Sequence, residues 1–82
     1  MPADGFVRLQ REKKGRGGKT VTIVTGLPGN EAALDALLST LKQHCGSGGT
    51  REGDVLVIQG DHRERLKTRL EALGHRVVLA GG

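Results

Sequence analysis

Aromatic residues are almost absent from this sequence. Its 82 residues include one Phe and neither Trp nor Tyr, so a hydrophobic core must be built from Leu, Val, Ile and Ala. Proteins that recognise single-stranded nucleic acids by base stacking carry several aromatic side chains on the binding surface. The shortage of rings therefore argues against base stacking as the basis of any nucleic-acid binding by this chain.

Long apolar segments and a second cysteine are missing as well. No apolar run exceeds four residues, the length of residues 55–58, which is far too short for a signal-peptide core or a membrane span. The one cysteine, Cys45, has no partner for an intramolecular disulfide and suits a reducing compartment. We therefore expect a cytoplasmic protein without membrane association.

Positive charge is what the chain has in excess. The formal net charge is +4 and the pI is about 9.8, which favours a polyanionic partner. The ten residues 11–20 hold five of the thirteen Lys and Arg residues and three glycines. Such a segment resists burial, because cations are costly to desolvate and glycine has no side chain to pack. It is either an inert, solvated hairpin tip or a flexible cationic loop that contacts an anionic partner.

Alternating apolar and polar residues predict strands over residues 6–12 and 19–25, and the second of these is rich in β-branched side chains. The glycine-rich segment between them predicts a β-hairpin whose extended tip is the basic hairpin loop, residues 11–19. An uninterrupted apolar run indicates a central strand over residues 54–59. A last short strand is predicted over residues 75–80.

Two helices are predicted, each with one apolar face. The first begins after an N-cap at Asn30 and ends at Gly46; the second begins after Asp61, with Glu64 completing a capping box, and ends at Gly74. Apolar residues at three- and four-residue spacing define the core-facing side of each helix. These positions are Leu34, Leu37, Leu38, Leu41 and Cys45 in the first helix, and Leu66, Leu70 and Leu73 in the second.

The element order ββαβαβ predicts an α/β fold of the α+β two-layer sandwich type: a four-stranded mixed sheet with two helices on one face. Strands that follow one another through a helix are expected to be parallel neighbours joined by right-handed crossovers. Thr50 and Arg51 are candidates for a short edge strand. We expect a single domain, residues 6–82, after a flexible N-terminal segment, residues 1–5.

The end of the basic loop, Gly18-Lys19-Thr20, matches the last residues of a nucleotide-binding P-loop. The full pattern requires a glycine where Lys13 stands. A P-loop is also followed by a helix, whereas the β-branched residues 21–24 predict a strand. We therefore expect no nucleotide hydrolysis.

No arrangement of residues predicts an enzyme, a metal site or a cofactor site. His44 and Cys45 are adjacent, but His62 and His75 lie far along the chain, and no zinc-ligand spacing results. Cys45 is better explained as a small buried residue at the end of the first helix. Helix capping explains Asp61 and its partner in the capping box. We expect no catalytic residue, no metal and no cofactor.

Three segments of the sequence carry a family resemblance. They are the basic hairpin segment 15–22 with the Gly-Leu that follows it, the Cys-Gly-Ser-Gly-Gly-Thr turn at 45–50, and Val-Ile-Gln-Gly-Asp-His-Arg at 57–63. Together they resemble the eukaryotic-type translation initiation factor 1 family in its short bacterial and archaeal form. The resemblance implies a non-enzymatic two-helix, mixed-sheet sandwich that binds the small ribosomal subunit. Such a protein affects start-codon selection or translation regulation.

The resemblance also implies where RNA binds. In related factors the basic hairpin loop reaches ribosomal RNA beside the initiator tRNA. The implied partners of this protein, a monomer, are small-subunit ribosomal RNA and the initiator tRNA complex. Contacts should be mostly to phosphate and sugar, although a solvated helix face explains the cations of the second helix equally well. The residues expected at the RNA are Arg11, Lys13, Lys14, Arg16 and Lys19 in the loop, and Arg63, Arg65 and Lys67 in the second helix.

A second class of function stays open at this point. The sheet face away from the helices is expected to carry Val24, Val55, Val57 and Val78 as a partly apolar surface. Such a surface suits a protein-interaction module without direct RNA contact. Salt distinguishes the two classes, because binding to phosphates weakens steeply with ionic strength and an apolar contact does not.

Overall fold

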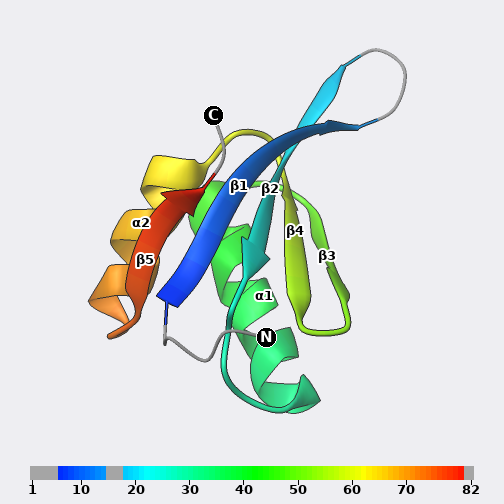
Figure 1. Cartoon of the computed structure of the whole chain (residues 1–82). Helices are drawn as coiled ribbons and strands as arrows, with labels where there is room; N and C mark the ends of the chain where they lie inside the picture. The colour runs from blue at the N-terminus through cyan, green and yellow to red at the C-terminus, as the bar shows by residue number, and fades with distance from the viewer. Residues whose placement is uncertain (1–5, 15–17, 81–82) are drawn as a thin grey trace.

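The computed structural model describes residues 6–14 and 18–80 of the chain (Figure 1). Within these residues, five strands form one sheet and two helices pack against it. The predicted flexible segment, residues 1–5, and Arg16 of the predicted loop lie outside the described residues. In chain order the elements are β1 (Phe6–Lys14), β2 (Lys19–Thr25), α1 (Glu31–Cys45), β3 (Gly49–Glu52), β4 (Val55–Gln59), α2 (Arg63–Ala72) and β5 (Arg76–Ala80).

The observed order is ββαββαβ, so the prediction of a four-stranded sheet with the order ββαβαβ is wrong by one strand. The additional strand is β3, which forms an antiparallel hairpin with β4 and includes the edge-strand candidates Thr50 and Arg51. The sequence did not clearly indicate β3, because its first residue is a glycine and glycine is depleted in strands. Yet a Cβ on Gly49 would lie 2.7 Å from the Val57 carbonyl oxygen. Glycine is therefore what lets β3 approach β4 this closely.

The strands also pair differently from the predicted parallel neighbours. The sheet order is β3-β4-β2-β1-β5, with β2 antiparallel to β4 and β5 parallel to β1. The hairpin of β3 and β4 reverses the chain once more than predicted, and β4 therefore runs against β2. Because β3 covers the outer edge of β4, β5 pairs at the remaining edge, beside β1.

Both helices cover the same face of the sheet, as predicted, and the core lies between these two layers (Figure 1). The side-chain oxygen of Asn30 caps α1 by accepting a 2.9 Å hydrogen bond from the Ala33 N–H. Gly46 ends the helix in the left-handed conformation. Both caps confirm the prediction. The buried core residues are Val7, Leu9, Val24, Leu27, Leu34, Leu41, Cys45, Leu56, Ile58, Leu66, Leu70 and Val77, with Leu37 and Leu38 packed against them.

Two predictions for α2 are wrong. The helix begins at Arg63 with His62 at the N-cap position, and the side chain of His62 makes no capping hydrogen bond, so Asp61 is not its N-cap. Asp61 lies one residue too early and accepts hydrogen bonds from Arg63 instead. Leu73 follows the last helical residue and is 46% exposed, because the chain is already leaving the helix at that point. Leu73 is therefore not part of the core.

Strand β2 turns Thr22 and Val24 towards the helices. Both side chains are 0% exposed, and Val24 lies in the core with Leu9, its direct partner on β1. Because side chains alternate between the two faces of a strand, Val21 and Ile23 lie on the face without helices. The prediction that Val24 lies on this open face is wrong. The strand is β-branched on both faces, so its sequence does not indicate which face is covered.

Candidate nucleic-acid interface

The ends of β1 and β2 extend beyond the rest of the sheet. The two strands pair with each other as far as Lys14 and Lys19. The pairing of β1 with β5 stops at Gln10, and that of β2 with β4 stops at Val21. Beyond Val21 and its partner Glu12, the hairpin is a two-stranded ribbon that projects from the body of the protein (Figure 1). Arg11, whose partner Thr22 still pairs with β4, lies at the base of this ribbon. The strands that lead into the predicted basic loop thus form a projecting arm with a defined register.

Cationic residues lie on both faces of this ribbon. Arg11 and Lys13 are exposed, and alternation from Leu9 places them on the side of the sheet that the helices cover. Lys19 is also exposed, and alternation from Thr22 places it on the opposite side. The structure therefore brings Arg11 and Lys13 to the side of α2, whereas Lys19 faces away from it.

One carboxylate joins the hairpin to α2. Asp61 Oδ2 lies 3.5 Å from Arg11 Nη1, and Asp61 Oδ1 lies 3.1 Å from Arg63 Nε. The hydrogen bond from the Arg63 side chain lowers the pKa of Asp61, with smaller effects from the Arg63 backbone N–H and from the charges of Arg63 and Arg11. Two of the residues predicted to contact RNA therefore lie against the same acid, although they come from different elements.

Thr22 fixes the position of Asp61. Its hydroxyl donates a 2.7 Å hydrogen bond to the Gly60 carbonyl and accepts a 3.0 Å hydrogen bond from the His62 N–H. It is thus bonded to both neighbours of Asp61. The Gly60 N–H adds a 2.8 Å bond to the Thr20 carbonyl. Sequence reasoning missed Thr22, and the available signal was a hydroxyl among the apolar residues of the segment 21–24, which needs a partner once it is buried.

The segment after α1 packs beside the segment after β4. Ser47 Oγ lies 2.9 Å from His62 Nε2, and the Gln59 N–H donates a 2.9 Å hydrogen bond to the Gly48 carbonyl. The Gly-Gly-Thr and Gln-Gly-Asp segments that carried the family resemblance therefore support each other. Cys45, just before the first of these segments, is buried as predicted. Burial raises the pKa of its thiol, and a nearby arginine charge acts in the opposite direction.

Arg65 does not join Arg63 on one surface, and Lys67, one helical turn beyond Arg63, is paired with an acid of its own helix. Arg65 Nη1 donates a 3.4 Å hydrogen bond to the His44 carbonyl at the end of α1, and Lys67 Nζ forms a 2.9 Å ion pair with Glu71. Two positions along a helix correspond to a rotation of about 200°, so Arg65 and Lys67 lie on opposite flanks of α2. Of the three cations predicted on this helix, Arg63 is the one that meets the hairpin.

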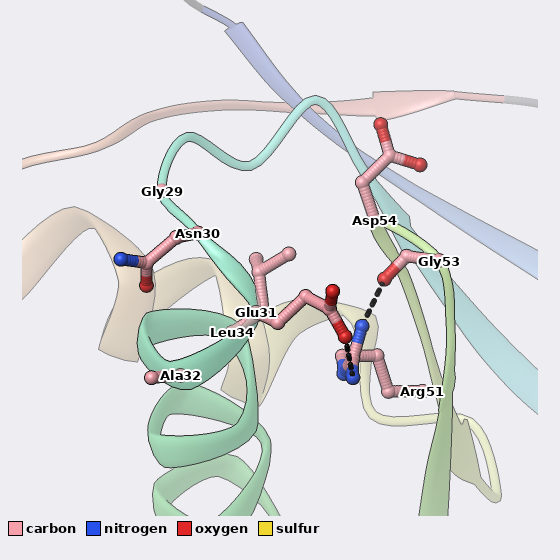
Figure 2. Close-up of a pocket in the computed structure, with 8 residues that line it drawn as sticks. All are labelled: Gly29, Asn30, Glu31, Ala32, Leu34, Arg51, Gly53 and Asp54. Atoms are coloured by element: carbon pink, nitrogen blue, oxygen red, sulfur yellow. Dashed lines mark hydrogen bonds and ion pairs between the residues drawn. The ribbon is translucent and has the colours of Figure 1, made fainter.

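The opposite end of the protein, where α1 begins and β3 turns into β4, holds an arginine between two acids (Figure 1; Figure 2). Arg51 pairs with Asp35 at 2.5 Å and with Glu31 at 3.2 Å, and it donates a 2.8 Å hydrogen bond to the Gly53 carbonyl. The hydrogen bonds to Asp35 and Glu31 raise the pKa of Arg51. Arg51 thus fastens β3 to α1 and is not available to an anion. The hollow beside it is lined by Gly29, Asn30, Glu31, Ala32, Leu34, Arg51, Gly53 and Asp54.

The sheet face without helices offers little apolar surface. By alternation it carries Val21, Ile23, Val55, Val57 and Val78. Val21 and Val57 are only 8% and 9% exposed, although no helix covers this face. Val21 and Val57 therefore contribute little to the partly apolar surface predicted for a protein partner.

Metal sites and membrane-spanning helices are not found within the part of the chain that the structure describes. Over residues 6–14 and 18–80, no group of three or more His, Cys, Asp and Glu side chains is placed to hold a metal ion. Neither described helix combines the length and the apolar character needed to cross a membrane.

Comparison with known proteins finds relatives that match most of the chain. The family model for Translation initiation factor SUI1 matches residues 3–76. Proteins of Salmonella typhimurium and Escherichia coli (strain K12), each described as uncharacterized protein YciH, are 48% and 49% identical over 79 residues, 96% of this chain and 73% of each relative. A Sulfurisphaera tokodaii protein, described as a protein translation factor SUI1 homolog, is 41% identical over 70 residues, 85% of this chain and 69% of the relative.

Proposed function

This chain belongs to the translation initiation factor SUI1 family, and we propose that it binds RNA of the small ribosomal subunit through the β1–β2 hairpin. The family resemblance predicted from the sequence is thereby confirmed. Through the proposed contact the protein influences start-codon selection or translation regulation, beside the initiator tRNA complex. It acts in the cytoplasm as a monomer and without catalysis. Because the family is one of translation factors, a ribosomal partner suits its basic surface.

The projecting ribbon is the observation that carries the proposal. Lys13 and Lys19 are exposed along it and Arg11 is exposed at its base, and Glu12 is the one acid in the sequence of residues 11–19. An arm without further strands beside it can carry these cations into a groove of a folded RNA, where phosphates lie on several sides. Cations on both faces of the ribbon suit such surroundings better than they suit a flat surface.

Contacts are expected with phosphate and sugar rather than with bases. Phe6 is the one aromatic residue, and it is half-buried at the start of β1, at the far end of the strand from the ribbon. Without a ring to stack on a base, binding must rely on charge, which makes it salt-dependent. If about five phosphates are neutralised, a tenfold rise in salt weakens binding by about three to four powers of ten.

Co-sedimentation with purified small ribosomal subunits tests the proposal. Replacing Arg11, Lys13, Lys14, Arg16 and Lys19 with Ala should abolish co-sedimentation. The circular dichroism spectrum should stay that of the native protein, because Arg11, Lys13 and Lys19, the members of this set whose side chains the structure describes, are exposed and lie outside the core. Retained binding by this variant at physiological salt would overturn the proposal.

A matched pair of variants separates the hairpin from the net charge. Lys13→Gln with Lys19→Gln removes two positive charges from the ribbon, and Lys42→Gln with Arg76→Gln removes two from α1 and β5. We expect the ribbon variant to lose at least about tenfold in affinity and the control less than about threefold. Equal losses would mean that overall charge, and not the hairpin, drives binding.

A protein-interaction module without direct RNA contact is the second candidate. The observation that favours it is the uncovered sheet face with its β-branched residues, of which Ile23, Val55 and Val78 are half-buried. Binding curves at low and moderate salt separate the two candidates. A salt-independent affinity for the small subunit favours an apolar contact with a ribosomal protein, and a steep loss favours the hairpin.

A further inference from the structure

We propose that Asp61 is a positioning residue for RNA binding: it holds Arg11 of the hairpin and Arg63 of α2 side by side, so that their guanidinium groups form one composite site for phosphates of an RNA backbone. The inference rests on the proposed function and adds a defined site to it. Its consequence is unusual, because an acid then strengthens the binding of an acidic polymer.

Both arginines keep donors available while they contact Asp61. The carboxylate engages Arg11 through Nη1 at 3.5 Å, and Arg63 through Nε at 3.1 Å and Nη2 at 3.5 Å. A guanidinium has five N–H donors, so each arginine retains several. The side chain of Arg11 is 44% exposed, that of Asp61 is 38% exposed and that of Arg63 is 22% exposed. The group therefore lies at the surface, where a phosphate can reach the remaining donors.

The position of the carboxylate is set by backbone hydrogen bonds. Thr22 is the direct partner of Arg11 across the hairpin, and its buried hydroxyl bonds to Gly60 and His62 on either side of Asp61. The cross-strand pair of Arg11 and Thr22 thus also holds the segment that contains Asp61. Such an arrangement keeps the acid facing Arg11 whether or not RNA is bound.

An acid beside an RNA-binding surface acts in one of two opposite ways. As a charge alone it repels phosphate, so its removal strengthens binding. As a positioning residue it holds two positively charged side chains together before RNA binds. Binding then does not include the free-energy cost of ordering these side chains or of overcoming the repulsion between them. The convergence of two arginines on one backbone-fixed carboxylate points to the second role.

These two roles predict opposite signs, and matched substitutions separate them. Asp61→Asn and Glu64→Gln each remove one negative charge, but Glu64 is exposed and is not part of the ion pairs that join Arg11 and Arg63 to Asp61. We expect Glu64→Gln to bind small subunits slightly more tightly than the native protein, and Asp61→Asn to bind about three- to tenfold more weakly. Asp61→Asn binding as tightly as Glu64→Gln would overturn the proposal.

A double-substitution cycle provides a second measure that leaves Asp61 in place. Arg11→Gln and Arg63→Gln are compared singly and combined. In a composite site either substitution already disrupts phosphate binding, so the combined loss should be smaller than the product of the single losses. A combined loss equal to that product would show two independent sites and would overturn the proposal.

Failure of this inference can be told apart from failure of the proposed function. If the five-alanine hairpin variant binds as the native protein does, the proposed function fails. If that variant loses binding while Asp61→Asn gains affinity, the hairpin binds RNA without the composite site, and the inference alone fails. Urea unfolding of Asp61→Asn shows whether its affinity changes while the fold is retained.

Discussion

Arg11 and Thr22 are direct partners across the β1–β2 hairpin, and both act on the same loop before α2. Thr22 bonds to Gly60 and His62, and Arg11 pairs with Asp61 between them. A single rung of the hairpin therefore connects the proposed RNA-binding arm to the start of α2. The body of the sandwich supplies a charge partner for the arm as well as its support.

Replacing Thr22 with Val should destabilise the protein. The change keeps the shape but leaves the Gly60 carbonyl and the His62 N–H without their hydroxyl partner in a part-buried site, at a cost of about 1–3 kcal/mol in the free energy of unfolding. Urea unfolding followed by circular dichroism measures this loss. The control is Thr68→Val, whose hydroxyl bonds to a carbonyl on the exposed side of α2 and whose loss should stay within about 0.5 kcal/mol. Equal losses would contradict the role given to Thr22.

Gly60 should tolerate alanine less well than Gly53. Both have positive φ, 95° and 63°, and alanine in this region costs about 1–2 kcal/mol. At Gly53 a Cβ would meet nothing within 4 Å, whereas at Gly60 it would lie 2.7 Å from His62 Nε2. Gly60→Ala should therefore also move the His62 ring away from Ser47, and its Tm should fall further than that of Gly53→Ala. Equal Tm values for the two variants would count against this contact.

The pairing of Asp61 should be lost in acid. Its contacts with arginine lower the pKa of Asp61 below the ordinary 3.8, so the folded state holds this proton more weakly than the unfolded state. The stabilisation is therefore complete above the ordinary pKa and disappears as pH falls through the lowered one.

A pH series of urea unfolding measures this effect. The stability difference between the native protein and Asp61→Asn should shrink as pH falls from about 4 to about 2. Because Asp61 is 38% exposed, added salt should also reduce the difference. A difference that is the same at both ends of the pH series would show that the ion pairs do not cause it.

The thiol of Cys45 should react slowly in the native protein. The residue is 9% exposed, and burial raises the pKa of its thiol, so little thiolate is present at about pH 8. Labelling with a chromogenic disulfide reagent should be slow without denaturant, faster at higher pH, and fast in urea. Equally fast labelling with and without urea would show that the end of α1 opens readily.

The helices and the hairpin could be predicted because their signals act over a few residues. Asn30 bonds to an N–H three positions along, and Gly46 ends α1 through its own backbone conformation. The hairpin follows from alternation on either side of glycines. Asp61 shows the limit of such signals, because a cap and a partner for Arg63 use the same carboxylate, and the sequence does not indicate which bond forms.

These local signals could not predict the order of the strands in the sheet. In the sequence Gly49 indicates a turn, and its close approach to the Val57 carbonyl is known only from the structure. If β3 is left out, β4 is predicted to run parallel to β2 and not antiparallel to it. β5 pairs with β1 from the other end of the chain. Pairings of this kind depend on which sheet edges remain free after the other strands are placed. The alternation of residues within one strand does not indicate which edge is free.

The sequence by itself determined the basic hairpin, the two helices and the family, since charge, glycine and caps act through neighbours along the chain. Only the tertiary structure decided that Arg11 meets Arg63 at Asp61, whereas Arg65 contacts the end of α1 and Lys67 pairs with Glu71. The hydrogen bonds of Thr22 that arrange this meeting join residues 38 and 40 positions apart. They exist because β2 and β4 pair in one register, and that register is a property of the whole sheet.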